Sequence, residues 1–195
     1  MITYAASKIS SFFIHKKIIL EKDKEVYDYC FEVLIAFLLN FIIIISLALI
    51  TRTFLFGMLF LLAFLPLRIT VGGYHANTHL KCMITLVFTY LIFVSLIRVF
   101  PANLITVTCF GILALSESII FLFAPSEDKN NPLNKNKKCQ LRLRGRIIGM
   151  LYALISVCGL FVLKNLFLTF SFVLGFFTVA LSVLANKIKY QLTED

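Results

Sequence analysis

The amino-acid sequence predicts an all-α integral membrane protein, with about six transmembrane helices and an N-terminal interfacial amphipathic helix. Of its 195 residues, 60% are hydrophobic and 15% are charged, and the mean hydropathy is +0.94. The apolar residues come in long blocks, and a chain of this length cannot bury so much apolar surface in a water-soluble core. The first thirty residues are rich in Lys, Asp and Glu without a small-residue cleavage site, so no signal peptide is expected.

Residues 1–30 predict the interfacial helix and, after it, a charged connector. One face carries apolar side chains at helical spacing, and the other carries small polar residues and a lysine. A mobile polar tail is the alternative, which the regular apolar face disfavours. The apolar set is Ile2, Ala5, Ala6, Ile9, Phe12 and Phe13, and the polar set is Ser7, Lys8, Ser10 and Ser11.

Six apolar segments follow, each predicted to cross the bilayer once. They are residues 33–50, 54–67, 83–99, 104–124, 147–163 and 166–184. The second segment is the shortest, and Pro66 near its end predicts that its helix stops there, because proline disrupts helical hydrogen bonding. Because the second segment is short for a helix that crosses the bilayer alone, a homodimer is possible. Nothing in the sequence specifies one.

The distribution of basic residues predicts the orientation. If the N-terminus is cytoplasmic and each segment crosses once, the loops on the far side hold only three basic residues, Arg52, Arg98 and Lys164. Both termini are therefore predicted to be cytoplasmic. The segment 68–82 and a long basic loop at 125–146 then share the cytoplasmic side.

The net charge of +9 and the five cysteines narrow the class of protein further. The basic residues gather at one membrane face without a nucleic-acid-binding module, so attraction to the anionic lipid bilayer explains them better than nucleic acid does. An acidic peptide segment is a second ligand that this charge would suit. The cysteines have no paired spacing, which argues against a disulfide framework or a zinc ribbon.

The segment 68–82 holds polar and ionisable residues between two apolar blocks, where they are costly to bury and indicate a functional site. A cysteine nucleophile needs a base within about 3 Å of its sulfur, directly or through one water. On one straight helix, His75 and Cys82 would lie about 10.5 Å apart along the axis. Because Gly72-Gly73 favours irregular backbone and Asn77 or Thr78 is a suitable N-cap, we expect His75 in a loop folded over the helix that carries Cys82.

Cys82 would then lie near a helix N-terminus, which favours a thiolate, as does neighbouring Lys81. Backbone N–H groups of the turn, together with Arg68, could stabilise a developing oxyanion.

Two other interpretations of the same residues remain open. His75, His79 and Cys82 share one helical stripe and could bind a metal ion, with Glu117 as the only intramembrane carboxylate available to join them. The histidines could also be interfacial polar residues with no chemical role. The predicted mechanism needs neither a metal nor another cofactor.

Two motifs in this order resemble the accessory gene regulator B (AgrB) family of membrane cysteine endopeptidases of bacterial quorum sensing. The first is Arg68, then Gly72-Gly73-Tyr74-His75-Ala76, then Cys82. The second is the stretch 124–133, Ala-Pro-Ser-Glu-Asp-Lys-Asn-Asn-Pro-Leu. The resemblance covers nearly the whole chain, as a single domain at 1–195. One departure is Asn131, where the family pattern commonly has Arg.

The resemblance implies that the protein lies in the bacterial plasma membrane and removes the C-terminal tail of an AgrD-like precursor peptide. Cys82 would attack the scissile carbonyl, with His75 as base and then as acid. A Cys or Ser of the precursor would capture the resulting thioester and give a cyclic thiolactone or lactone. Thioester exchange is nearly neutral in free energy, so the acyl-enzyme makes this ring accessible.

The resemblance also implies roles for further residues. Arg68 is expected to contact substrate or oxyanion, and Gly73 to set the backbone geometry. The positive charge of the loop, on the same side of the membrane as the motif, separately predicts that Lys129, Lys137 and Lys138 contact the acidic tail of the precursor. Simple anchoring of the basic cluster at the cytoplasmic face is the alternative. Glu117 either orients His75 or is a structural carboxylate.

The rival function is a membrane transporter or exporter, or a metal-binding membrane protein that uses His75, His79 and Cys82. A transporter commonly has polar residues at mid-membrane in several spans and internal repeats. These spans are nearly free of charge and no repeat is visible. Cleavage of a peptide by the pure protein would separate the classes.

Overall fold

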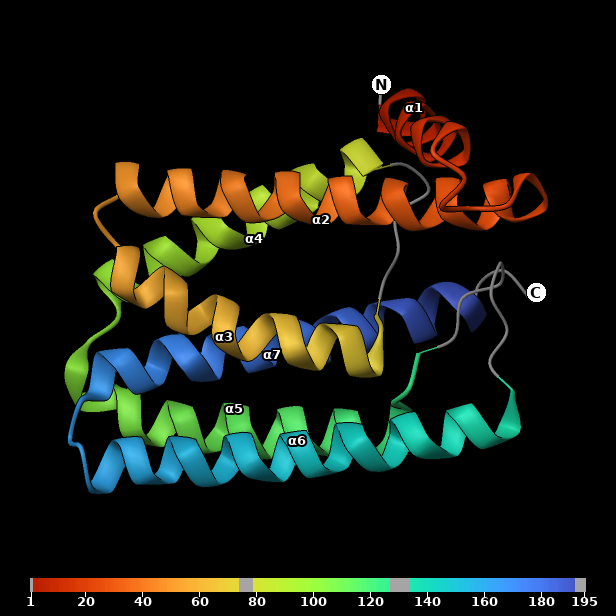
Figure 1. Cartoon of the computed structure of the whole chain (residues 1–195). Coiled ribbons are helices and arrows are strands. Elements are labelled where there is room, and N and C mark those ends of the chain that lie inside the picture. Colours follow the sequence, from red (N-terminus) through yellow and green to blue (C-terminus); the bar gives the residue numbers. More distant parts are fainter. Residues whose placement is uncertain (1, 74–78, 127–133, 192–195) are drawn as a thin grey trace. The chain divides into compact units, whose positions relative to one another are not determined.

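The structure is a computed structural model that describes residues 2–73, 79–126 and 134–191, and its described part is helical, with no strand. Six of its helices are long and apolar enough to cross a membrane, which confirms the predicted fold class. The elements in chain order are α1 Ile2–His15, a short 3-10 helix Glu21–Asp23, α2 Lys24–Ile50, α3 Phe54–Val71, α4 His79–Val99, α5 Ala102–Phe123, α6 Lys135–Phe161 and α7 Leu166–Gln191 (Figure 1).

The chain divides into two compact units, residues 1–47 and residues 48–195. In the first unit the rings of Phe13 on α1 and Phe31 on α2 stack with their centroids 5.6 Å apart. Ser10 was predicted on the polar face of α1, but it is buried and its hydroxyl donates to the Ala6 carbonyl. The charged connector is also shorter than predicted, because α2 already begins at Lys24.

In the second unit, α7 is the most buried of the membrane-spanning helices and packs against α3, α4, α5 and α6. Small residues allow the close approach that helices need in a membrane, where lipid is as apolar as the side chains. Gly175 of α7, for example, lies directly against the Phe60 carbonyl of α3. On the other side of α3, Phe60 packs on Phe93 of α4 with ring centroids 4.6 Å apart.

The helix α3 continues past Pro66 to Val71, so the prediction that it ends at Pro66 is wrong. Proline lacks the N–H that would bond to the carbonyl four residues earlier, which here is the carbonyl of Leu62. The Tyr152 hydroxyl of α6 donates to that carbonyl at 3.2 Å. The replacement bond lets the helix run on by one more turn, and that turn carries Arg68.

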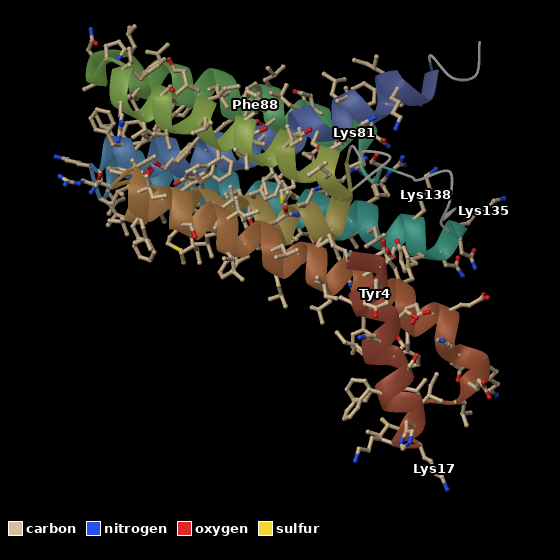
Figure 2. All side chains as sticks on the ribbon, turned by 90° about the horizontal axis from the view of Figure 1, so that it is seen from above. Tyr4, Lys17, Lys81, Phe88, Lys135 and Lys138 are labelled. Carbon is tan, nitrogen blue, oxygen red and sulfur yellow. The ribbon has the colours of Figure 1, made fainter. Side chains whose placement is uncertain are left out.

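One end of the second unit gathers the segments singled out in the sequence. The C-terminal ends of α3, α5 and α7 lie there with the N-terminal ends of α4 and α6 (Figure 1). Figure 2 shows Lys81, Lys135 and Lys138 at this end, whereas Phe88 projects from the middle of α4. The segment predicted as a loop at 125–146 is helical from Lys135 onward, so its basic cluster lies on the first turns of α6.

Candidate functional site

Arg68 and Cys82 come together although they belong to different helices. Arg68 is in the last turn of α3 and Cys82 is in the first turn of α4. The guanidinium and the half-buried Cys82 side chain lie close enough to interact electrostatically. The structure thus places a cationic side chain near a cysteine in the first turn of a helix.

Several predicted residues lie outside the described part of the chain. They are His75, Asn77, Thr78 and Lys129, and they include the base expected to act on Cys82. The geometry of a His75–Cys82 pair and the metal interpretation that uses His75 therefore stay predictions.

Two glycines at the end of α3 have backbone conformations and surroundings that exclude other residues. Gly72 has φ +74°, and a Cβ there would lie 2.9 Å from the Ser126 carbonyl oxygen. Gly73 has φ +136°, and a Cβ there would overlap both the Arg68 guanidinium and the Ser182 hydroxyl. Both positions therefore require glycine.

Two hydrogen bonds hold the guanidinium of Arg68 in place. Its Nη1 donates to the Gly72 carbonyl at 3.0 Å and to the Ser182 hydroxyl of α7 at 2.5 Å. The Gly72 N–H in turn donates to the Arg68 carbonyl at 3.0 Å. The side chain is thus held at the helix end beside Cys82 rather than extended into solvent.

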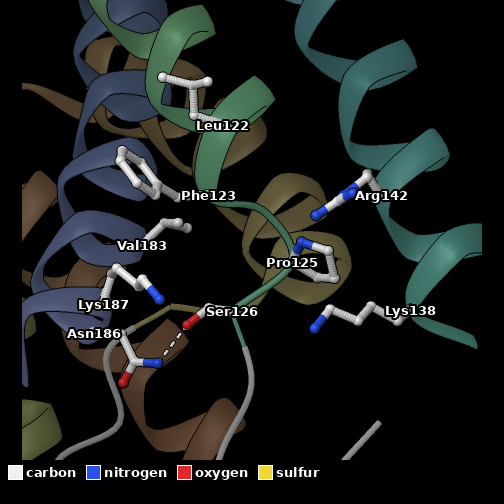
Figure 3. Close-up of a pocket in the computed structure, with 9 residues that line it drawn as sticks. All are labelled: Leu122, Phe123, Pro125, Ser126, Lys138, Arg142, Val183, Asn186 and Lys187. Carbon is white, nitrogen blue, oxygen red and sulfur yellow. Dashed lines mark hydrogen bonds between the residues drawn. The ribbon is translucent and has the colours of Figure 1, made fainter. Parts of the chain in front are cut away.

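The second motif joins the first through Ser126. The Ser126 N–H donates to the Val71 carbonyl at the end of α3, at 2.8 Å. The Asn186 amide of α7 donates to the Ser126 hydroxyl, a contact drawn as a dashed line in Figure 3. The preceding Ala124–Pro125 peptide bond is cis. Both motifs and one face of α7 thus form a single hydrogen-bonded junction.

A pocket of about 200 Å³ opens beside this junction (Figure 3). It lies between the ends of α5, α6 and α7. Its lining combines an apolar wall with three cationic side chains, a hydroxyl and an amide. The lining residues are Leu122, Phe123, Pro125, Ser126, Lys138, Arg142, Val183, Asn186 and Lys187.

A family model described as accessory gene regulator B matches residues 6–184. The chain belongs to the accessory gene regulator B family. No curated protein and no solved structure matches it. Membership in the AgrB family and six apolar helices make this a multi-pass membrane protein involved in processing a quorum-sensing precursor peptide.

The basic residues of α6 differ in what they contact in this AgrB family member, and Arg142 both bonds to the end of α5 and lines the pocket. Arg142 and Arg146 donate to carbonyls at the C-terminal end of α5, Ala124 at 3.3 Å and Phe121 at 3.1 Å. Cations at a helix C-terminus satisfy its terminal carbonyls and its dipole. Lys138 lines the pocket, whereas Lys137 is exposed and is not part of the lining.

Glu117, the intramembrane carboxylate, faces α6. A Cβ on Gly149 would lie 2.8 Å from its Oε2, so the carboxylate occupies the space that this glycine leaves. Its Oε1 is buried and accepts no hydrogen bond from any residue that the structure describes. The contact with α6 accounts for the absence of a side chain at 149.

Ser182 and Asn186 were not singled out from the sequence, although the structure joins Ser182 to Arg68 of the first AgrB motif and Asn186 to Ser126 of the second. Ser182 and Asn186 are four residues apart and therefore share one face of α7. Two polar side chains at that spacing, near the end of an otherwise apolar span, are the signal that could have identified them.

Proposed function

We propose that this AgrB family member is a membrane cysteine endopeptidase, with Cys82 as nucleophile and His75 as general base. Its substrate is an AgrD-like precursor peptide, from which it removes the C-terminal tail. The observation that carries the proposal is that Arg68 interacts electrostatically with Cys82, which lies in the N-terminal turn of α4. A cation and a helix N-terminus around one cysteine are the surroundings typical of reactive thiols.

In the proposed reaction His75 takes the proton of Cys82, and the thiolate attacks the scissile carbonyl carbon. Arg68 and backbone N–H groups stabilise the oxyanion that forms. The C–N bond then breaks, the leaving amine takes the proton from His75, and the rest of the precursor stays on Cys82 as a thioester.

A Cys or Ser side chain of the precursor then attacks this thioester. The new bond closes a thiolactone or lactone ring, and Cys82 leaves as the free thiol. Because one thioester replaces another, or an ester replaces a thioester, the step needs no external energy source. Hydrolysis would compete with ring closure, so a site at the membrane end of a packed bundle favours the cyclic product.

The proposed location is the bacterial plasma membrane with both termini in the cytoplasm, where the precursor is made. The end of the second unit that carries Arg68, Cys82 and the basic turns of α6 then faces the cytoplasm. The excess of basic residues at this end supports that orientation.

The test is cleavage of the precursor by protein reconstituted in lipid, with products read by intact mass. Wild type should release the tail and give a cyclic product or an acyl-enzyme, and Cys82→Ala should give neither. Cys158→Ala is the matched control, because Cys158 is an exposed thiol near the far end of α6 and should be dispensable. Cleavage by Cys82→Ala, or loss of wild-type cleavage on adding a chelator, would refute the cysteine mechanism.

A further inference from the structure

The pocket between α5, α6 and α7 brings three cationic side chains around one space. Figure 3 shows the nitrogen ends of Lys138, Arg142 and Lys187 turned toward the region beside Pro125 and Ser126. Of the lining residues that the structure describes, none is acidic. Three cations that share one pocket attract an anion strongly, and the hydroxyl of Ser126 and the amide of Asn186 add polar partners.

We propose that this pocket binds the headgroup phosphate of an anionic phospholipid. Cys82 is not among the described residues that line the pocket, and the proposal does not depend on the peptidase reaction.

The position of the pocket in the bundle favours a lipid. It lies where two membrane-spanning helices end and a third begins, α5 at Phe123, α7 at Gln191 and α6 at Lys135. This is the depth at which phospholipid headgroups meet a transmembrane protein. Basic pockets between such helix ends are known sites for anionic headgroups.

The apolar wall supports the same ligand. Leu122 lines the pocket and is 65% exposed, and Phe123 beside it is 37% exposed. Figure 3 shows Leu122 on α5, up the helix from Pro125, with Lys138 on the other side of that proline. A phospholipid has matching chemistry, with acyl chains to lie along the exposed apolar side chains and a phosphate to meet the cations. A short acidic peptide would leave the apolar wall uncovered.

The three cations are not equivalent in the site. Arg142 already donates its Nε to the Ala124 carbonyl, which fixes the guanidinium and directs its remaining N–H groups to a ligand. Lys138 is half-buried, whereas Lys187 is exposed. Arg142 therefore sets the geometry of the phosphate contact, and the two lysines contribute charge.

The proposal can be tested by measuring lipid retention on the full-length protein. Wild type is placed in phosphatidylcholine nanodiscs that contain a minor fraction of phosphatidylglycerol, and the lipids that stay bound are identified by native mass spectrometry. Wild type should retain phosphatidylglycerol in preference to phosphatidylcholine. The variant Lys138→Gln/Arg142→Gln/Lys187→Gln should lose this preference by more than about twentyfold, and Lys187→Gln alone by about fivefold.

The matched control is Lys135→Gln/Lys137→Gln/Arg144→Gln, which removes the same charge from exposed positions of α6 outside the pocket lining. It should keep the preference of wild type. Equal losses in the two triple variants would overturn the proposal in favour of diffuse surface attraction. If the pocket triple variant does not fold, the single Lys187→Gln variant still provides a test. Unchanged retention of phosphatidylglycerol by Lys187→Gln would also count against the site.

Two competitors distinguish the source of the anion. Neither inorganic phosphate nor a short polyglutamate peptide should displace the retained phosphatidylglycerol, because neither can cover the apolar wall. Displacement by phosphate would mean that the pocket takes any small phosphate. Displacement by the peptide would assign the pocket to an acidic polypeptide instead, and either result would refute the lipid site.

Discussion

The guanidinium of Arg68 on α3 donates a hydrogen bond of 2.5 Å to the hydroxyl of Ser182 on α7. This bond joins a residue of the AgrB motif to a helix that follows it by more than half of the chain. Through it, the cation beside Cys82 is positioned by tertiary packing as well as by the backbone of its own helix. The chemistry of the site therefore depends on α7.

Replacing Ser182 by Ala removes this partner and leaves Arg68 with the Gly72 carbonyl. Because a hydrogen bond to a charged group contributes about 1.5–3 kcal/mol, we expect cleavage to slow by about tenfold or more. Alkylation of Cys82, followed by intact mass, should slow as well. A structural effect elsewhere in the protein would not slow this alkylation. Ser182→Thr keeps the hydroxyl and should restore both rates.

The control for Ser182 is Ser171→Ala on the same helix. In the described part of the chain, the Ser171 hydroxyl donates to the Phe167 carbonyl of its own helix at 2.9 Å, so this variant should behave as wild type. A Ser182→Ala protein with normal alkylation and cleavage would show that Arg68 needs no support from α7.

Gly73→Ala should abolish cleavage. The new Cβ would occupy the space of the Arg68 guanidinium and the Ser182 hydroxyl, and φ at this position is +136°. Gly111→Ala is the matched substitution and should keep full activity, because a Cβ there would meet no described atom within 4 Å apart from its chain neighbours and the nearby backbone of its own helix. Equal activity of the two variants in the precursor assay would contradict the described turn.

Tyr152→Phe should lower the free energy of unfolding by about 1–3 kcal/mol, because the Leu62 carbonyl, which Pro66 leaves without a backbone donor, would lose its partner. Pro66→Ala supplies a backbone N–H to the same carbonyl. In that background, Tyr152→Phe should therefore lower the free energy of unfolding by much less. The four proteins of this double-mutant cycle can be compared by denaturant unfolding in detergent. If the effects of the two substitutions on the free energy of unfolding simply add, the Tyr152 hydroxyl does not replace the N–H that Pro66 lacks.

Glu117→Gln should cleave the precursor at a rate close to that of wild type, because the carboxylate packs against Gly149 of α6 and its amide analogue has the same shape. The variant tests whether Glu117 orients His75. A loss of about a hundredfold or more in cleavage, with normal thermal stability, would instead indicate a role in general acid–base catalysis.

The sequence predicts the membrane spans and the location of the motif because both depend on local composition. Block hydropathy indicates the six spans, and the bias of basic residues groups the motif with the segment 125–146. The glycine pair also predicts irregular backbone where α3 ends. Hydropathy, charge bias and a glycine pair all depend on residues that are close together in the sequence, so they can be predicted from it.

The errors have a common physical origin in contacts between distant residues. Pro66 does not end α3 because Tyr152, far along the chain, supplies the missing donor. The basic segment 135–146 is helical, although its charge led to the prediction of a loop. Its Arg142 and Arg146 donate to carbonyls at the end of α5. Nothing near Ser182 in sequence indicates that it meets Arg68.

The order of the elements along the chain decides when the site can form. Ser182 and Asn186 are synthesised after their partners Arg68 and Ser126, so both partners are made before these two bonds can form. A nascent chain that has not yet inserted α7 carries both motifs in an unassembled state. Translation of α7 is therefore the step that completes the site, and a polypeptide interrupted before it lacks the bonds of Ser182 and Asn186 to the two motifs.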